Sequence, residues 1–222
     1  MKKLIAIVSS LFLVTSISAK AEMGMGISGA VHMLDGSGTE TTRQSGEKNT
    51  GSHSEDIAVP ELFIEAINDN GAAFGLSYIM TRDMGTRSRT DSESPGDTDS
   101  DDGTYTAKAE FDDVIKVYGD LPLPVDVPYI GGLPYVHIGV QHVTLSTLES
   151  LNGGTSYPNE NLLGTTVGLG VKGDLPYGNN MYYKTEVTYT DFETYEGKSS
   201  AGNSVSADLD STALRISIGY KF

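Results

Sequence analysis

The final nine residues of the chain, Leu214 to Phe222, alternate between large apolar side chains and small or polar ones. A period of two residues is typical of a β-strand with one apolar face and one polar face. The chain then stops on an aromatic residue. Of all segments this strand constrains the fold most, because its apolar face must meet either a protein core or lipid. The apolar residues of this closing strand are Leu214, Ile216, Ile218, Tyr220 and Phe222.

Composition narrows the class of protein. The chain has 222 residues, which is enough for one domain, and it is rich in Gly and Tyr while lacking Cys and Trp. High Gly with many Tyr suits a β-protein. The absence of Cys fits an exported protein that needs no disulfide framework. The formal net charge of −15 argues against binding to nucleic acid and against docking on anionic membrane surfaces.

The N-terminus predicts a secretory signal peptide. Lys2 and Lys3 precede an apolar run from Leu4 to Ile17, and Ala19-Lys20-Ala21 forms an A-x-A cleavage site. The run is shorter than the ~20 apolar residues that a membrane-spanning helix needs. We therefore expect residues 1–21 to be removed and residues 22–222 to form the mature domain.

Seven further segments carry the alternating pattern of strands. They are separated by long polar segments at residues 35–56, 82–103, 149–161 and 195–207, which predict loops. Shorter connections alternate with these loops. In one strand the acidic pair Asp112-Asp113 interrupts the alternation and predicts an interface position or a β-bulge. The expected strands are Met23–Met33, Ile57–Ile67, Ala72–Thr81, Thr104–Gly119, Val136–Leu148, Leu163–Lys172 and Met181–Thr190.

These features together predict an all-β fold. An even number of strands, with connections that alternate between short and long, is typical of a transmembrane barrel. We expect an eight-stranded antiparallel up-and-down transmembrane β-barrel with short periplasmic turns and long polar external loops. A β-sandwich would show the same alternation, but here the apolar faces carry large, uncharged side chains. Small residues on the opposite faces suit the narrow interior of an eight-stranded barrel.

Charged residues on the opposite faces should therefore point inward. A cation on the lipid face costs ~2–4 kcal/mol at the bilayer midplane, so lipid-facing positions avoid charge. Balanced charges in a narrow interior should pair. Two alternatives remain open, a structural salt-bridge core and a narrow ion path that opens when pairs exchange partners. The predicted interior charge network is Glu61, Glu65, Lys108, Glu110, Lys116, Lys184, Glu186 and Arg215.

Within that network, we expect Arg215 to meet Glu186 on the neighbouring strand, with Glu61 or Glu65 as further partners. Aromatic residues at strand ends are candidates for the girdles that such barrels place at the membrane interfaces. They are Tyr78, Tyr105, Tyr183, Tyr189, Tyr220 and Phe222.

Candidate sites for metals and catalysis are weak. Acidic residues in the segment 82–103 offer oxygen ligands for a divalent cation, with Asp97, Asp99, Asp101 and Asp102 as the densest group. The spacing of these acids lacks the Gly and the terminal Glu that an EF-hand loop needs at fixed positions, so a solvated, self-repelling loop is favoured. We predict no metal, no cofactor and no catalytic residues.

Histidines do not predict an enzyme. The chain has four, His32, His53, His137 and His142. The segment from His53 to Glu55 contains the residue types of a hydrolase triad, but adjacent residues on one segment do not form a triad. His137 should point inward and bond to an interior carboxylate.

From Glu22 to Phe222 the chain resembles the superfamily of small outer-membrane β-barrels that includes the OmpA transmembrane domain, OmpX and the opacity-type proteins. The segments Val117–Pro122 and Leu133–Val140 look like the strand–connector–strand core of opacity-like barrels from marine alphaproteobacteria. The closing strand, ending at Phe222, resembles the assembly signal of this superfamily. The resemblance implies export through the periplasm to the outer membrane, with periplasmic chaperones, the barrel-assembly machinery and outer-membrane lipid as partners.

Such a fold does not determine a function. The superfamily's roles include anchoring, adhesion, small-solute leakage and, rarely, lipid chemistry. We expect a non-enzymatic integral outer-membrane barrel, structural or narrow and porin-like. The alternative is a surface adhesion or receptor protein that binds an unidentified external ligand through its loops, and a third hypothesis is a barrel enzyme acting on lipid A.

Overall fold

The computed structural model describes residues 21–41, 43, 46, 48–91, 103–125, 131–150, 157–176, 178–200 and 202–222. Residues 1–20 of the predicted signal peptide and the residues Asp97, Asp99, Asp101 and Asp102 lie outside this part of the chain. The described residues contain no helix that is long and apolar enough to cross a membrane. The strands are β1 (Glu22–Thr41), β2 (Lys48–Ile67), β3 (Ala73–Ile79), β4 (Arg82–Asp91), β5 (Gly103–Pro122), β6 (Leu133–Ser150), β7 (Glu160–Asp174), β8 (Met181–Phe192), β9 (Tyr195–Lys198) and β10 (Ser204–Lys221).

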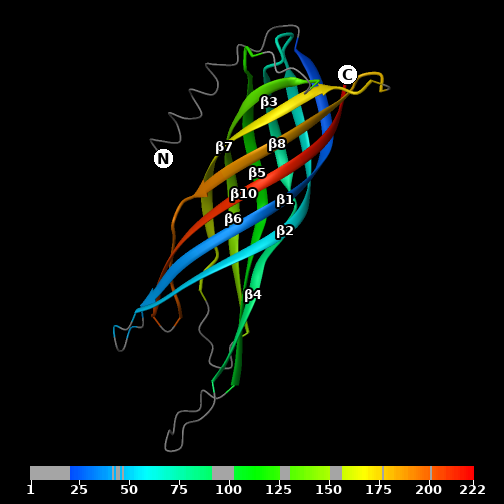
Figure 1. Ribbon diagram of the computed structural model, residues 1–222. Helices are drawn as coiled ribbons and strands as arrows, with labels where there is room; N and C mark the ends of the chain where they lie inside the picture. The colour runs from blue at the N-terminus through cyan, green and yellow to red at the C-terminus, as the bar shows by residue number, and fades with distance from the viewer. Residues whose placement is uncertain are drawn as a thin grey trace, which may run out of the picture.

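The strands form one antiparallel sheet that closes on itself (Figure 1). Strand β4 continues β3 along β5, and β9 continues β8 along β10, so ten segments make an eight-stranded barrel. Closure comes from β1, which pairs with β10 as well as with β2. The last residue takes part, because Phe222 N donates to Met23 O at 2.9 Å. The predicted fold class is confirmed.

The outer surface carries a belt of exposed apolar side chains. On β10 the exposed residues Leu214, Ile216 and Ile218 alternate with the buried Arg215 and Ser217. The same alternation on the other strands produces a continuous apolar exterior, and the closed sheet leaves no unpaired edge within it. Exposed apolar residues on the other strands include Met25, Ile27, Leu62, Ile64, Leu76, Ile115, Val167, Leu169 and Val187.

The two ends of the barrel differ. Short connections, such as the turn in which Gly71 N donates to Asn68 O, lie at the same end as both termini of the described barrel. At the opposite end the paired strands are long (Figure 1), and β1 and β2 stay paired to Thr41 and Lys48, well past Met33, an exposed apolar residue of the belt. Short turns mark the periplasmic side of such barrels and long connections the external side. We call these the periplasmic end and the outer end.

Strands at the outer end are longer than the sequence predicts. Most of residues 35–56, predicted as a loop, is strand, because β1 and β2 stay paired as far as Thr41 and Lys48. Parts of the other predicted loops, 82–103, 149–161 and 195–207, are likewise strand in β4, β5, β6, β7, β9 and β10. Beyond the membrane both faces of a hairpin meet water. The backbone ladder then needs no apolar alternation, so the hydropathy pattern cannot reveal it.

A β-bulge occurs at the acidic pair in β5. The register with β6 shifts between Asp112 and Ile115, and Asp113 has a positive φ of 50°. Because a bulge inserts one extra residue, it reverses which alternate residues face inward. Lys116 and Tyr118 face inward on the periplasmic side of the bulge, whereas Phe111 does so on its outer side.

The barrel interior has two layers. Nearer the periplasmic end, polar and charged side chains fill most of the lumen, beside a small buried cluster of Phe63, Ile67, Ala73 and Tyr182. Nearer the outer end, the inward-facing residues are mainly apolar. Val59 follows Glu61 in this direction along β2, and Val143 follows His137 along β6. A mainly polar interior was expected, so this second layer is a difference from the prediction. Its buried members, here called the apolar cluster, are Leu34, Val59, Ile79, Phe111, Val114, Val143, Leu145, Leu162, Phe192, Tyr195 and Leu209.

Glycines make room for interior tyrosines. A Cβ on Gly75 would lie 2.4 Å from the Tyr118 ring, and one on Gly219 would lie 2.4 Å from the Tyr182 ring. Only a residue without a side chain lets these rings lie flat against the wall. The inward-facing glycines therefore position the tyrosines that contact the charged layer.

We expect Ile216→Lys to destabilise the barrel by ~2–4 kcal/mol, because Ile216 lies in the middle of the belt and is 61% exposed on its outer face. The control is Thr212→Lys, on the same face of β10 at the outer rim, with an expected cost of ~0–1 kcal/mol. Equilibrium unfolding by urea in phospholipid vesicles measures both. Equal stability of the two variants would contradict the membrane placement.

Candidate functional site

The charged layer is a continuous network that crosses the lumen. It contains six of the eight predicted residues, and each of these is almost fully buried. Alternation along the strands directs them inward, and barrel closure brings distant strands together. The six residues are Glu61 and Glu65 on β2, Lys116 on β5, Lys184 and Glu186 on β8, and Arg215 on β10.

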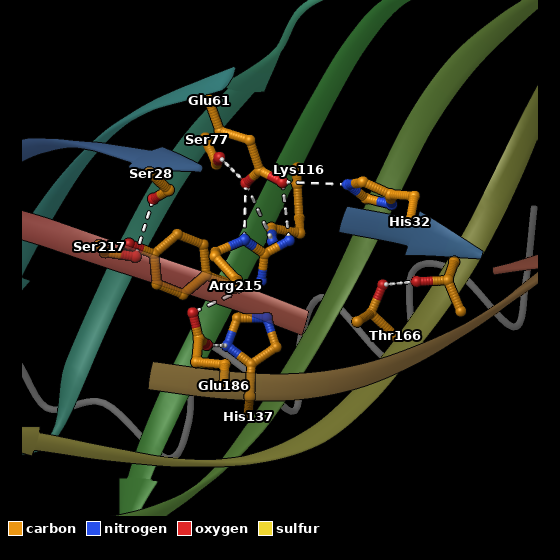
Figure 2. Close-up of polar contacts among 12 residues, drawn as sticks. Ser28, His32, Glu61, Ser77, Lys116, His137, Thr166, Glu186, Arg215 and Ser217 are labelled. Carbon is orange, nitrogen blue, oxygen red and sulfur yellow. Dashed lines mark hydrogen bonds and ion pairs between the residues drawn. The ribbon is translucent and has the colours of Figure 1, made fainter. Parts of the chain in front are cut away.

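Glu61 is held by partners from four other strands (Figure 2). Arg215 binds it through two parallel hydrogen bonds, from Nε to Oε2 at 2.8 Å and from Nη2 to Oε1 at 2.9 Å. His32 Nε2 lies 3.3 Å from Oε1, and Ser77 Oγ donates to Oε2 at 3.3 Å. Lys116 Nζ lies 4.0 Å from Oε2. A bidentate Arg–carboxylate pair is the strongest of these contacts.

From Arg215 the network continues through alternating acids and bases. Arg215 Nη1 donates to Glu186 Oε2 at 3.4 Å. His137 Nδ1 lies 2.9 Å from Glu186 Oε1 and 2.8 Å from Asp120 Oδ1. Lys184 Nζ lies 2.6 Å from Asp120 Oδ2. No acid in this series is left without a cation or a histidine beside it.

The network returns to β2 at Glu65. This carboxylate accepts hydrogen bonds from Tyr118 Oη at 2.7 Å, Tyr182 Oη at 2.8 Å and Lys184 Nζ at 3.0 Å. Burying an ion is costly unless it is paired and its remaining lone pairs are hydrogen-bonded. Glu65 meets both conditions. The lumen is therefore filled by groups that stabilise one another.

Sequence reasoning missed several members of the network. His32 lies on the inward face of its strand, a position that the alternation in residues 23–33 already indicates. The predicted strand ends at Gly119, whereas β5 continues to Pro122 and carries Asp120 into the lumen. Tyr118 and Tyr182 were not singled out either, because their role depends on the inward-facing glycines of other strands.

Lys108 and Glu110 are not members of the network, which corrects the prediction. The bulge at Asp113 turns both side chains outward, above the apolar belt. There Lys108 Nζ contacts Glu110 Oε1 at 2.5 Å and Asp83 Oδ1 at 2.8 Å. The hydrogen bond from Lys108 lowers the pKa of Asp83 below its usual value.

Asp120, His137 and Glu186 are the residues of the described chain whose positions come nearest to a metal site, with ligand atoms within 4.8 Å of one another. However, Lys184 and Arg215 already neutralise the two carboxylates. A metal-bound histidine normally donates its second ring N–H to an acceptor, and His137 Nε2 has no such partner. These residues fit ion pairing better than metal binding.

The segment from His53 to Glu55 does not form a triad. His53 Nε2 lies 3.4 Å from Glu55 Oε2 on one face of β2. Ser54 points to the opposite face, where its hydroxyl donates to Asp35. A nucleophile and its base must lie within hydrogen-bond reach of each other, and alternation along the strand prevents this.

Open space lies at the ends of the lumen rather than at its centre. The void lined by Glu61, Lys116, His137, Glu186 and Arg215 has a volume of about 10 Å³, which is roughly one water molecule. A cavity of about 390 Å³ opens at the periplasmic end, and a polar cleft of about 1030 Å³ opens at the outer end. The network separates them.

Comparison with known proteins gives matches in structure only. No family model matches the sequence, and no curated protein matches it. The barrel is similar to the crystal structure of the outer membrane protein OprG from Pseudomonas aeruginosa, with a TM-score of 0.57 and 16% sequence identity over 91% of this chain and 96% of that one. The chain has the fold of the small outer-membrane β-barrels.

Two further outer-membrane barrels match less closely. Outer membrane protein AlkL matches with a TM-score of 0.47 and 12% sequence identity over 91% of this chain and 90% of that one. Neisserial surface protein A matches with a TM-score of 0.42 and 12% sequence identity over 89% of this chain and 97% of that one. The closed sheet and the similarity to OprG establish the fold. The apolar belt gives this outer-membrane barrel its membrane location.

We expect Arg215→Met to destabilise the outer-membrane barrel by ~3–5 kcal/mol, because it leaves the buried Glu61 without its bidentate partner and removes one partner of Glu186. The matched control is Lys221→Met, which breaks the exposed pair with Asp174 and should cost ~0–1 kcal/mol. Adding Glu61→Gln to Arg215→Met should recover part of the loss. Urea unfolding in vesicles measures all three variants, and equal costs for Arg215→Met and Lys221→Met would refute the network's role.

Proposed function

We propose that this outer-membrane barrel is structural, non-enzymatic and closed to solutes at rest. The observation that carries the proposal is the filled lumen. Two successive layers occupy the path that a solute would take, first the charged network and then the apolar cluster. Water and ions need a continuous polar path, and beyond the network the buried residues are mainly apolar, with isolated polar groups such as Arg82 over the Phe111 ring.

The network favours a structural salt-bridge core over a narrow ion path. A partner exchange that opened a path would require Arg215 to leave a bidentate pair with Glu61. It would also require room for the displaced side chain, and the central void holds about one water molecule. Both requirements oppose spontaneous opening.

Planar-bilayer recordings of the refolded protein test this proposal. We expect the wild-type barrel to show no steady conductance. A double substitution, Lys184→Ala with Arg215→Ala, removes two large side chains from the charged layer and should produce brief conducting events. The control Lys221→Ala should remain silent. Steady wild-type channels of the same size as those of the double variant would contradict a closed barrel.

A second candidate function is recognition at the cell surface. Strands β1, β2, β9 and β10 project past the belt and surround the polar cleft of about 1030 Å³, which is lined by hydroxyl groups and by charges that include Lys48 and Lys198. A cleft on projecting strands is accessible from outside the cell. It suits a polar external ligand better than an apolar one.

Binding to arrayed glycans and to extracellular-matrix proteins, with the barrel in lipid nanodiscs, tests this second candidate. We expect Lys48→Ala with Lys198→Ala to weaken any binding about tenfold or more, through loss of charged hydrogen bonds worth ~1.5–3 kcal/mol each. Deleting residues 92–102, which lie outside the described part of the chain, is the comparison. Binding that is lost only in the deletion would move recognition away from the cleft.

A further inference from the structure

Lys172 on β7 carries a buried ammonium group that lacks a counterion. The residue is 7% exposed, and its Nζ has no hydrogen-bond partner in the described part of the chain. The ammonium lies 5.3 Å from the centroid of the Tyr135 ring, and such a cation–π contact supplies no hydrogen-bond acceptor. A buried charge is costly unless it is paired and hydrogen-bonded. Lys172 therefore needs an acceptor that the described residues do not supply.

The buried acids do not serve as that acceptor, because other cations hold them. Each of the four buried acids among the described residues forms an ion pair with Arg215 or Lys184. Five buried cations stand against these four acids, so the buried charges leave an excess of one positive charge. The acids are Glu61, Glu65, Asp120 and Glu186, and the cations are Arg82, Lys116, Lys172, Lys184 and Arg215.

Lys172 lines the cavity of about 390 Å³ that opens at the periplasmic end. This volume lies within the range of small-molecule sites, which is roughly 300–1,000 Å³. Ile67, Leu133 and the ring of Tyr182 give the cavity an apolar wall. Leu133 packs closely there, since a Cβ on Gly71 would lie 2.3 Å from its Cδ2. The cavity thus combines one unpartnered cation with an apolar surface.

Three acids also line the cavity, but they lie at its rim. Glu22, Asp69 and Asp174 are all exposed, so water and salt screen their charges. Asp174 is also paired with Lys221, whose Nζ lies 2.7 Å from Oδ1. Lys172 is shielded from water, and a charge in such surroundings acts more strongly on its neighbours. An anion that enters therefore passes screened acids and reaches an unscreened cation.

We propose that this cavity binds a small carboxylate with a short apolar chain, taken up from the periplasm. The carboxylate accepts a hydrogen bond from Lys172 Nζ, and the apolar chain packs on Ile67, Leu133 and the Tyr182 ring. The Tyr182 hydroxyl already donates to Glu65, so this residue presents its ring to the ligand. Binding requires no opening of the charged network, because the cavity lies on the periplasmic side of it. The site is therefore compatible with a barrel that is closed to solutes.

Titration with butyrate tests the site, with the barrel in lipid nanodiscs and its glycines isotope-labelled for NMR. Gly71 and Gly173 line the cavity, so we expect their amide signals to shift and saturate, while that of Gly168 in the middle of β7 stays unchanged. Lys172→Met should weaken binding at least tenfold, the loss expected for a hydrogen bond between charged groups. The control Lys108→Met makes the same charge change near the outer end and should leave the affinity unchanged. Heat-modifiable gel migration checks that each variant has folded.

Two further ligands separate a carboxylate from other chemistries. Butyramide has the same shape without the charge and should bind at least tenfold more weakly than butyrate. Inorganic phosphate tests for a general anion site, and tighter binding of phosphate than of butyrate would overturn the assignment to a carboxylate.

Equal affinity of the wild type and Lys172→Met for butyrate would overturn the proposal, as would unshifted signals of Gly71 and Gly173. If Lys172→Met does not fold, Leu133→Trp takes its place, because it fills the cavity and keeps every charge. This variant should weaken butyrate binding at least threefold, and an unchanged affinity would again overturn the proposal.

Discussion

Backbone hydrogen bonding in a solvent that offers no partners is the constraint on which this structure depends. Inside a bilayer every N–H and C=O must be satisfied by the protein itself, and a sheet can do this only by closing. Pairing of β1 with β10 provides the closure, and it extends to the final residue through the bond from Phe222 to Met23. All other features follow from it, since closure makes one face of every strand a lipid surface and the other a narrow lumen.

The lumen is too narrow to hydrate ions, so its charges must satisfy one another. The network joins residues that are far apart in the sequence. It runs from Glu61 through Arg215, Glu186 and His137 to Asp120, and Lys184 links Asp120 to Glu65. Interior tyrosines contribute hydrogen bonds because glycines across the wall leave space for their rings. Toward the outer end, beyond this layer, the lumen becomes mainly apolar.

Within the membrane, much of the fold and the site could be predicted from alternation alone. Six of the predicted charged residues face the lumen as expected: Glu61, Glu65, Lys116, Lys184, Glu186 and Arg215. Prediction failed where alternation gives no information. The bulge beside Asp112 turned Lys108 and Glu110 outward, and the outer hairpins need no apolar face, so they resembled loops. The apolar cluster was missed because its members, such as Leu34 and Phe111, are contributed singly by many strands.

The sequence by itself determined which residues meet lipid and which face inward. A strand has only two faces, and a charged side chain on the lipid-facing one is costly near the bilayer midplane. It also determined that the inward charges had to pair. Only the tertiary structure decided the partners, since Arg215 and Glu61 meet through closure between the two ends of the chain. The same holds for the point at which pairing of β2 with β3 ends, at Glu61 and Ile79, because it depends on how far the two strands remain in register.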